Sequence, residues 1–147
     1  MKKTLLIDTG PLVAFVNQKE QYHHWVIKKL TEMKIKSPIL TCEPVITEAC
    51  FLLRKVYGGE DAIMNLVRSG KIDIAFSLRV EIDDIKELMQ KYKSVPMSLA
   101  DGCLVRMSEL YPHTSLLTLD NDFWVYRKNQ NQMIDLIIPD DLSISNK

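Results

Sequence analysis

The residues that most clearly could carry chemistry are two aspartates, each of which directly follows an apolar segment. Asp8 ends the stretch "TLLID", and Asp120 ends the stretch "SLLTLD". A carboxylate at the end of a buried segment must be paired with a base, solvated in a cleft or bound to a cation. Each aspartate alone could simply cap a following helix. Two such positions weaken that simple explanation without removing it.

Glu48 is the acid least expected from its surroundings. It lies in the predicted helix "EPVITEACFLLRKVY" at residues 43–57, whose apolar face would consist of Val45, Ala49, Leu52 and Val56. Glu48 falls within that face, so we expect its carboxylate to be buried. An unpaired buried carboxylate costs several kcal/mol or becomes protonated. Glu48 therefore requires either a salt bridge, to Arg54 or Arg106, or a functional site.

Two further aspartates have a simple structural explanation beside a functional one. Asp101 would lie in the first turn of a predicted helix at 98–110, where it would complement the helix dipole with Ser98 as the cap. Asp122, in "LDNDF", could close an Asx turn before Phe123.

These acids must be positioned by strands and helices that alternate along the chain. Strands are predicted at 3–7, 37–41, 71–76, 115–119 and 133–139, and helices at 10–17, 22–33, 43–57, 61–69, 80–93 and 98–110. Gly58-Gly59 would stop the third helix. This alternation predicts one α/β domain spanning 1–147, a parallel sheet with helices on both faces. Residues 140–147 are expected to be frayed.

The expected sheet would bring the acids together. Open parallel sheets bind ligands at the carboxyl ends of their strands, so Asp8 and Asp120 would share one crevice if their strands are neighbours. Carboxylates that converge in a partly dry cleft repel one another by several kcal/mol, and a divalent cation removes that repulsion. Oxygen ligands suit Mg²⁺ or Mn²⁺. Zinc is disfavoured because no His/Cys cluster has ligand spacing.

The overall charge and the cysteines limit the class of protein. Nineteen Lys and Arg residues balance nineteen Asp and Glu residues, so attraction to nucleic acid or to an anionic membrane must be local. No apolar run is long enough to span a membrane, which requires about 18 residues. Cys42, Cys50 and Cys103 are odd in number and lack CxxC spacing, which indicates buried free thiols in a cytoplasmic protein.

Four motifs together resemble the PIN-domain ribonucleases, and especially the single-domain VapC-type toxins. They are "LLIDTGPLVAF", "PVITEACFLL", "SLADGCLV" and "LLTLDNDF", and in this order they span nearly the whole chain. The resemblance implies a five-stranded parallel sheet in the order 3-2-1-4-5, between two layers of helices. It assigns an acidic catalytic and metal-binding quartet, an auxiliary fifth acid and two small polar groups: Asp8, Glu48, Asp101 and Asp120; Asp122; Thr9 and Thr118.

The resemblance also implies an activity and partners. The activity would be endonucleolytic hydrolysis of RNA by a water that Mg²⁺ or Mn²⁺ activates. The chain would be the toxin of a toxin–antitoxin pair, inhibited by a small antitoxin protein and forming a homodimer. Local cations would contact RNA, and the candidates are Arg54, Arg106, Arg127 and Lys128. Tyr126 or Trp124 could stack on a base, although a core position is the simpler explanation for each.

Other functions are compatible with the same residues. The chain could be a stand-alone RNA-processing PIN nuclease, or a non-catalytic protein-binding domain that retains the acidic pocket. A receiver-type or phosphatase module that uses Asp8 as phosphoacceptor is disfavoured. Such phosphatases carry a DxD pattern, whereas Thr9-Gly10 follows Asp8 here.

Overall fold

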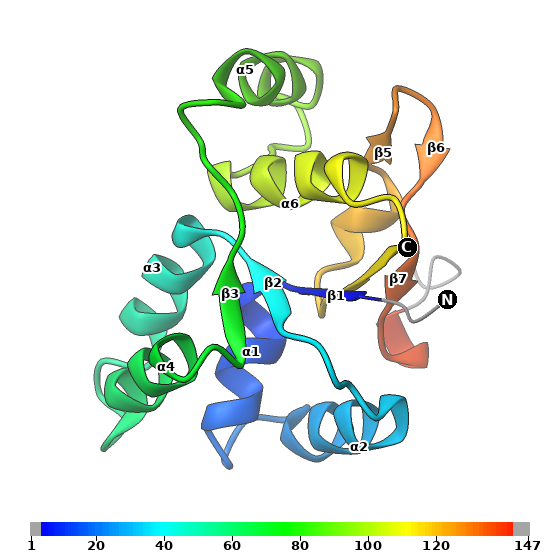
Figure 1. Ribbon diagram of the computed structural model, residues 1–147. Helices are drawn as coiled ribbons and strands as arrows, with labels where there is room; N and C mark the ends of the chain where they lie inside the picture. The colour runs from blue at the N-terminus through cyan, green and yellow to red at the C-terminus, as the bar shows by residue number, and fades with distance from the viewer. Residues whose placement is uncertain (1–3, 143–147) are drawn as a thin grey trace.

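The centre of the computed structural model, which describes residues 4–142, is a parallel sheet (Figure 1). Its strands are β1 (Thr4–Ile7), β2 (Ile39–Thr41), β3 (Ile72–Ile74), β4 (Thr114–Leu117) and β7 (Leu136–Ile137). They lie in the order β3-β2-β1-β4-β7, all parallel. The predicted order 3-2-1-4-5 is therefore confirmed, with β7 as the fifth strand. Lys3, predicted to begin the first strand, lies outside the described residues.

The central strands are apolar because helices cover both of their faces. Leu5, Leu6, Leu116 and Leu117 are fully buried. This pattern is typical of parallel strands that pack on two sides. Ile7 of β1 pairs in register with Leu117 of β4, so both strands end at the same edge of the sheet. The residues that follow them therefore lie side by side.

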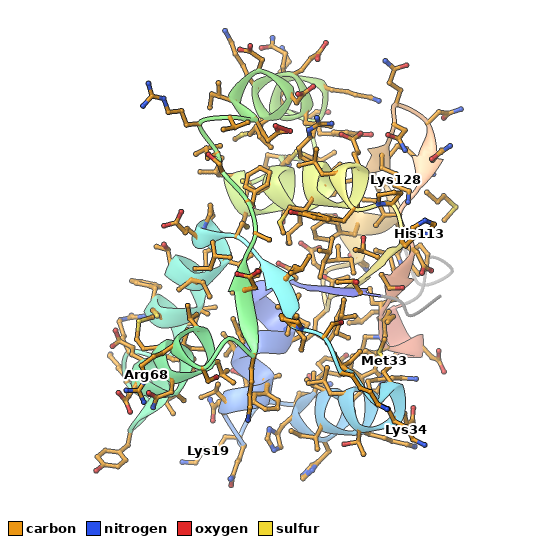
Figure 2. The ribbon with its side chains drawn as sticks, viewed as in Figure 1. Lys19, Met33, Lys34, Arg68, His113 and Lys128 are labelled. Carbon is orange, nitrogen blue, oxygen red and sulfur yellow. The ribbon has the colours of Figure 1, made fainter. Side chains whose placement is uncertain are left out.

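Within residues 4–142, six α-helices form the outer layers. They are α1 (Thr9–Val16), α2 (His23–Met33), α3 (Glu43–Leu52), α4 (Gly59–Arg68), α5 (Ile82–Lys91) and α6 (Leu99–Leu110). In Figure 1, α1 and α2 lie on one side of β1 and α6 lies on the other, with α5 stacked outside α6. Figure 2 shows side chains filling the space between these layers. The arrangement confirms the predicted three-layer α/β architecture.

The predicted helix at 43–57 is wrong at its end, because α3 stops at Leu52. The chain then makes successive turns, in which Val56 N donates to Leu53 O at 2.9 Å and Gly59 N donates to Val56 O at 2.9 Å. Gly58 has a φ of 71° and immediately precedes α4. A Cβ on Gly59 would lie 3.0 Å from the backbone oxygen of Leu53. The two glycines therefore join two helices instead of terminating one.

The C-terminal region also differs from expectation. A short hairpin of β5 (Arg127–Lys128) and β6 (Gln132–Met133) precedes β7, so the predicted strand at 133–139 is wrong at its beginning. Asp140–Leu142 forms the 3-10 helix η2 instead of a frayed tail. Trp124 Nε1 donates to Leu142 O at 3.1 Å and holds this helix against the domain. Residues 143–147 lie outside the described part of the chain.

The structure bears on two expectations, one about membrane-spanning helices and one about the cysteines. None of the helices within residues 4–142 combines the length and apolarity that a membrane crossing requires. Cys42, Cys50 and Cys103 are free thiols, as predicted. Cys42 and Cys103 are buried, whereas Cys50 is only partly buried.

Candidate active site

The sequence left two roles open for Asp8, a helix cap and an acid at a functional site, and the structure is compatible with both. Asp8 follows β1 and caps α1, because its Oδ1 accepts a hydrogen bond from Thr9 N at 2.7 Å. Its Oδ2 accepts a hydrogen bond from Thr118 Oγ1 at 2.8 Å. The side chain is only 6% exposed. Burial is the main cause that raises the pKa of Asp8 to about 7, and the hydrogen bonds from Thr118 and Thr9 only partly oppose it.

Asp120 is joined to Asp8 through one hydroxyl group. Thr118 Oγ1 donates to Asp8 and accepts a hydrogen bond from Asp120 N at 3.0 Å. Asp120 also caps the 3-10 helix η1 (Asn121–Trp124), because its Oδ1 accepts from Asp122 N at 2.9 Å. The prediction that Asp122 closes this turn is therefore wrong, since Asp120 supplies the side-chain acceptor and Asp122 the backbone donor.

Asp101 is fixed at the beginning of α6 by a capping box. Its backbone N donates to Ser98 Oγ at 3.1 Å, and Ser98 N donates to Asp101 Oδ2 at 3.2 Å. The predicted cap is confirmed. The same Oδ2 accepts a second hydrogen bond, from Tyr126 Oη at 3.2 Å. Burial raises the pKa of Asp101, and the charge of Asp120 raises it further.

Glu48 does not lie where the sequence predicted, because it is exposed and not part of the buried face of α3. That face is formed by Val45, Ala49 and Leu53, at a spacing of four residues. Leu52, predicted to be buried, is 56% exposed. Glu48 precedes the buried Ala49 by one residue and lies outside the buried stripe, and its Oε2 accepts a hydrogen bond from Thr9 Oγ1 at 3.1 Å.

The predicted salt bridge of Glu48 with Arg54 or Arg106 does not form. Arg54 Nη1 instead donates to the carbonyl of Phe51 at 2.6 Å, on the exposed side of α3. The guanidinium of Arg106 pairs with three other carboxylates, those of Glu81, Asp84 and Glu109. Thr9 is therefore the residue that connects Glu48 to the acidic edge, since its N–H contacts Asp8 and its hydroxyl contacts Glu48.

The acids at this edge are within electrostatic reach of one another. The charges of Asp101 and Asp120 both raise the pKa of Asp8. The charge of Asp122 acts on the neighbouring Tyr126, together with those of Asp101 and Asp120. Between residues 4 and 142, no lysine or arginine forms an ion pair with Asp8, Glu48 or Asp101. Negative charge thus accumulates at the carboxyl ends of β1 and β4.

The donor set fits a hard cation that keeps part of its hydration. Among the described residues, no three His, Cys, Asp or Glu side chains are arranged to hold a metal ion together. Mg²⁺ commonly takes one or two protein carboxylates directly and keeps several water molecules. The buried carboxylate of Asp8 and its acidic neighbours offer only oxygen ligands, which suits Mg²⁺ or Mn²⁺.

Most of the cations predicted to contact RNA already have partners within the protein. Arg106 is committed to its three carboxylates, at distances of 2.9 Å to Glu81 and 3.0 Å to Glu109. Arg127 Nη1 donates to the carbonyl of Trp124 at 2.6 Å. Lys128 is half-buried in β5. Arg106 is therefore paired with carboxylates, and its contact with RNA stays a prediction.

The aromatic candidates for base stacking are also engaged in the core. Tyr126 is 0% exposed, so it cannot stack on an RNA base. Trp124 is half-buried and its indole N–H is used by η2. The simpler explanation, a core position, holds for Tyr126. The contact of its hydroxyl with Asp101 could not be predicted from the sequence. A buried tyrosine hydroxyl needs a polar partner, but sequence alone cannot name that partner.

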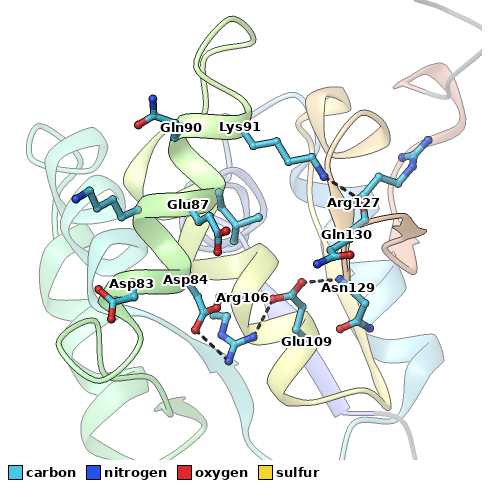
Figure 3. A pocket seen from close by; sticks show the side chains of 12 residues that line it. Asp83, Asp84, Glu87, Gln90, Lys91, Arg106, Glu109, Arg127, Asn129 and Gln130 are labelled. Carbon is cyan, nitrogen blue, oxygen red and sulfur yellow. Dashed lines mark hydrogen bonds and ion pairs between the residues drawn. The ribbon is translucent and has the colours of Figure 1, made fainter.

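One groove of the molecule lies away from the acidic edge. It has a volume of about 1060 Å³ and lies between α5, α6 and the β5–β6 hairpin (Figure 3). Its walls mix both signs of charge, including Asp84, Arg106 and Glu109. This groove contains none of the acids predicted for the site, and its mixed charge does not favour a polyanion.

Comparison with known proteins supports the fold. At the level of sequence, no protein-family model and no curated protein matches the chain. In three dimensions the chain is similar to the crystal structure of Mycobacterium tuberculosis VapC20, described as a sarcin–ricin loop cleaving toxin. The TM-score is 0.69 at 16% sequence identity, over 81% of this chain and 92% of that chain. The similarity confirms the VapC-like PIN fold that the sequence motifs implied.

Proposed function

We propose that this protein is a Mg²⁺- or Mn²⁺-dependent endoribonuclease of the VapC type, which hydrolyses RNA phosphodiesters with water as the nucleophile. The observation that carries the proposal is the buried Asp8 carboxylate at the end of β1, close to Asp101 and Asp120 and without a basic partner among residues 4–142. Parallel sheets bind their ligands at this edge. The fold shared with VapC20 supports the same conclusion.

The residues at this edge divide between holding the cation and orienting its ligands. Asp8, Asp101 and Asp120 would hold the cation directly or through water, with Glu48 and Asp122 at the margin. When bound, the cation lowers the pKa of water and neutralises charge on the phosphate. Thr118 fixes the Asp8 carboxylate, and Thr9 connects it to Glu48. In-line attack by water would leave a 5′-phosphate and a 3′-hydroxyl.

The raised pKa of Asp8 has a direct consequence for cation binding. With a pKa of about 7, Asp8 carries a proton on a large fraction of metal-free molecules at neutral pH. The Asp8 carboxyl group would have to lose that proton in order to hold a cation, so the apparent affinity for the cation should rise with pH. Asp8, Asp101 and Asp120 would repel one another less with a cation between them.

The partners belong to the same proposal. VapC20 is described as a toxin, and we infer that this chain is likewise a toxin that a small antitoxin protein inhibits by covering the acidic edge. A homodimer is proposed on the same resemblance. Co-expression with a candidate antitoxin should abolish cleavage, and sedimentation of the isolated chain should give the mass of two copies.

RNA cleavage with and without a divalent cation tests the proposed activity. We expect cleavage with Mg²⁺ or Mn²⁺, none in EDTA, and a loss of at least about 100-fold for Asp8→Asn and Asp101→Asn. Asp73→Asn, which changes an exposed carboxylate on β3, is the matched control and should cleave normally. Cleavage that survives in EDTA, or in both site variants, would overturn the proposal.

A thermal shift provides a second test that does not depend on the RNA chosen. A cation that binds only the folded protein raises its melting temperature in proportion to the logarithm of its concentration. We expect Mn²⁺ to raise the melting temperature of the wild type and of Asp73→Asn, but hardly that of Asp8→Asn. An equal shift in all three proteins would place the cation elsewhere.

A further inference from the structure

A buried tyrosine contacts one of the acids from outside the predicted motifs. Tyr126 follows η1 and is fully buried. Its ring makes edge-on contacts with Tyr92 at 5.1 Å and with Phe123 at 5.2 Å between centroids. Its hydroxyl reaches Asp101 Oδ2 at 3.2 Å, although 25 residues separate the two in sequence. Within this aromatic cluster, the Tyr126 hydroxyl is therefore the polar atom that contacts the acidic edge.

The hydroxyl of Tyr126 can only act as a donor toward Asp101. Burial and the nearby charge of Asp101 raise the pKa of Tyr126 well above its ordinary value, so the phenol keeps its proton. Asp101 Oδ2 receives this bond together with the one from Ser98 N. Two donors from different parts of the chain therefore converge on one oxygen and restrict rotation of the carboxylate.

The backbone that follows Tyr126 is held by hydrogen bonds to side chains at or next to the C-terminal ends of α5 and α6. Three hydrogen bonds fix it: Arg127 N to Tyr92 Oη at 3.0 Å, Asn129 N to Glu109 Oε2 at 2.5 Å, and Lys91 Nζ to Gln130 O at 3.0 Å. Figure 3 shows the last two beside the groove. Because its ring and the backbone that follows it are both anchored, Tyr126 offers its hydroxyl from a fixed position.

We propose that Tyr126 is a positioning residue that holds Asp101 in the orientation required for cation binding, an inference that rests on the proposed nuclease function. Asp101 lies within the repulsion of Asp8 and Asp120, and without a cation that repulsion favours a rotation toward solvent. The bond from Tyr126 opposes this rotation. Groups that hydrogen-bond a metal ligand commonly change metal affinity or activity about 10- to 100-fold when removed.

Tyr126→Phe tests the inference, because it removes one oxygen and keeps the ring contacts. We expect Mn²⁺ affinity, measured by calorimetry, and kcat for RNA to fall about 10- to 100-fold. KM for RNA should change little, and the metal-free melting temperature should fall by only a few degrees. Combined with Asp101→Asn, the substitution should weaken Mn²⁺ binding no further, because its effect passes through Asp101.

Tyr111→Phe is the matched control. Tyr111 lies at the other end of α6 and donates to Ala75 O at 2.8 Å, so its substitution also removes one tyrosine hydrogen bond. We expect wild-type Mn²⁺ affinity and kcat for this variant. An equal loss in both variants would show general loosening of α6 and overturn the inference.

The outcomes separate this inference from the proposed function. If the wild type cleaves RNA and binds Mn²⁺, and Tyr126→Phe binds Mn²⁺ equally well, the inference fails while the function stands. If the wild type neither cleaves RNA nor binds Mn²⁺, the proposed function fails, and the inference fails with it. That failure is visible in the wild-type measurement before any variant is compared.

Discussion

At the scale of single residues, the chemistry of the site depends on the charge state of Asp8. The ordinary pKa of an aspartate is near 4, whereas burial and the neighbouring acids raise that of Asp8 to about 7. The folded protein therefore retains a proton that the unfolded chain has already released between these two values. Folding is most favourable at the low end of this window and loses stability as the pH rises through it.

The first prediction follows from this decrease in stability with rising pH. In EDTA, the free energy of unfolding of the wild type should decrease between about pH 4 and pH 7, relative to that of Asp8→Asn, which cannot ionise. At pH 8 the variant should be the more stable protein, by at most about 4 kcal/mol. Urea unfolding at pH 5 and pH 8 measures both differences. A variant that is less stable than the wild type at pH 8 would contradict the assigned cause.

A second prediction concerns Thr118, whose hydroxyl joins Asp8 to the backbone of Asp120. Thr118→Val keeps the shape of the side chain. It removes the donor to the Asp8 carboxylate and the acceptor for the backbone N–H of Asp120. We expect a loss of about 1–3 kcal/mol in stability and of about 10- to 100-fold in kcat and Mn²⁺ affinity.

Thr114→Val is the control for that substitution. Thr114 begins β4, the strand that Thr118 directly follows, is also buried, and donates to Tyr111 O at 2.6 Å. Its loss should lower stability to a similar degree without changing cleavage per folded molecule. If both variants lose the same fraction of activity, Thr118 has only a structural role.

At the scale of elements, the beginning of α6 serves the fold and the site together. Ser98→Ala removes the side-chain acceptor of the capping box, and we expect it to cost about 1 kcal/mol of stability. Because Asp101 would lose part of its restraint, Mn²⁺ affinity should fall as well. Ser98→Thr retains a cap and should retain both properties. Thermal unfolding measures the stability of the two variants, and calorimetry measures their Mn²⁺ affinity. A Ser98→Ala protein with wild-type stability and affinity would contradict the prediction.

The elements also show which parts of the molecule a sequence can reveal. The strand–helix alternation was enough to predict a parallel sheet with helices on both faces, whereas the strand order came from the resemblance to PIN-domain ribonucleases. That order makes β1 and β4 neighbours, so Asp8 and Asp120 follow strands that end at one edge. The end of α3 could not be predicted, since Gly58-Gly59 is compatible with either a stop or a joint between helices. The burial pattern also differs from the expected face, since Leu53 is buried while Leu52 and Glu48 are exposed.

Contacts between distant segments were equally beyond the sequence. Arg106 was predicted as a cation for RNA because no local pattern shows that α5 supplies Glu81 and Asp84 to it. The bond from Tyr126 to Asp101 joins two buried or half-buried groups that no periodicity relates. Such contacts are set by how α5, α6 and the hairpin pack, which depends on the whole tertiary structure.

At the scale of the whole molecule, the charges leave little general attraction for RNA. Nineteen basic and nineteen acidic residues give a formal net charge of zero. Arg106 pairs with carboxylates, and Arg127 donates to backbone carbonyls. RNA binding should therefore depend on the cation at the acidic edge and on few direct contacts with phosphates, which has a measurable consequence.

That consequence is a weak dependence of RNA binding on salt. Each phosphate that a protein neutralises on a single strand releases about 0.7 counterion, so one or two contacts predict a loss of affinity of about three- to sevenfold between about 50 and 200 mM KCl. Fluorescence anisotropy of a labelled, cleavage-resistant analogue of the RNA with the wild type, at constant Mg²⁺, measures this slope. Cleavage of the unmodified RNA by the wild type confirms that its sequence is a substrate. A thousandfold loss would instead require an extended basic surface, which the arginines described here do not provide, and would indicate that RNA is bound away from the acidic edge.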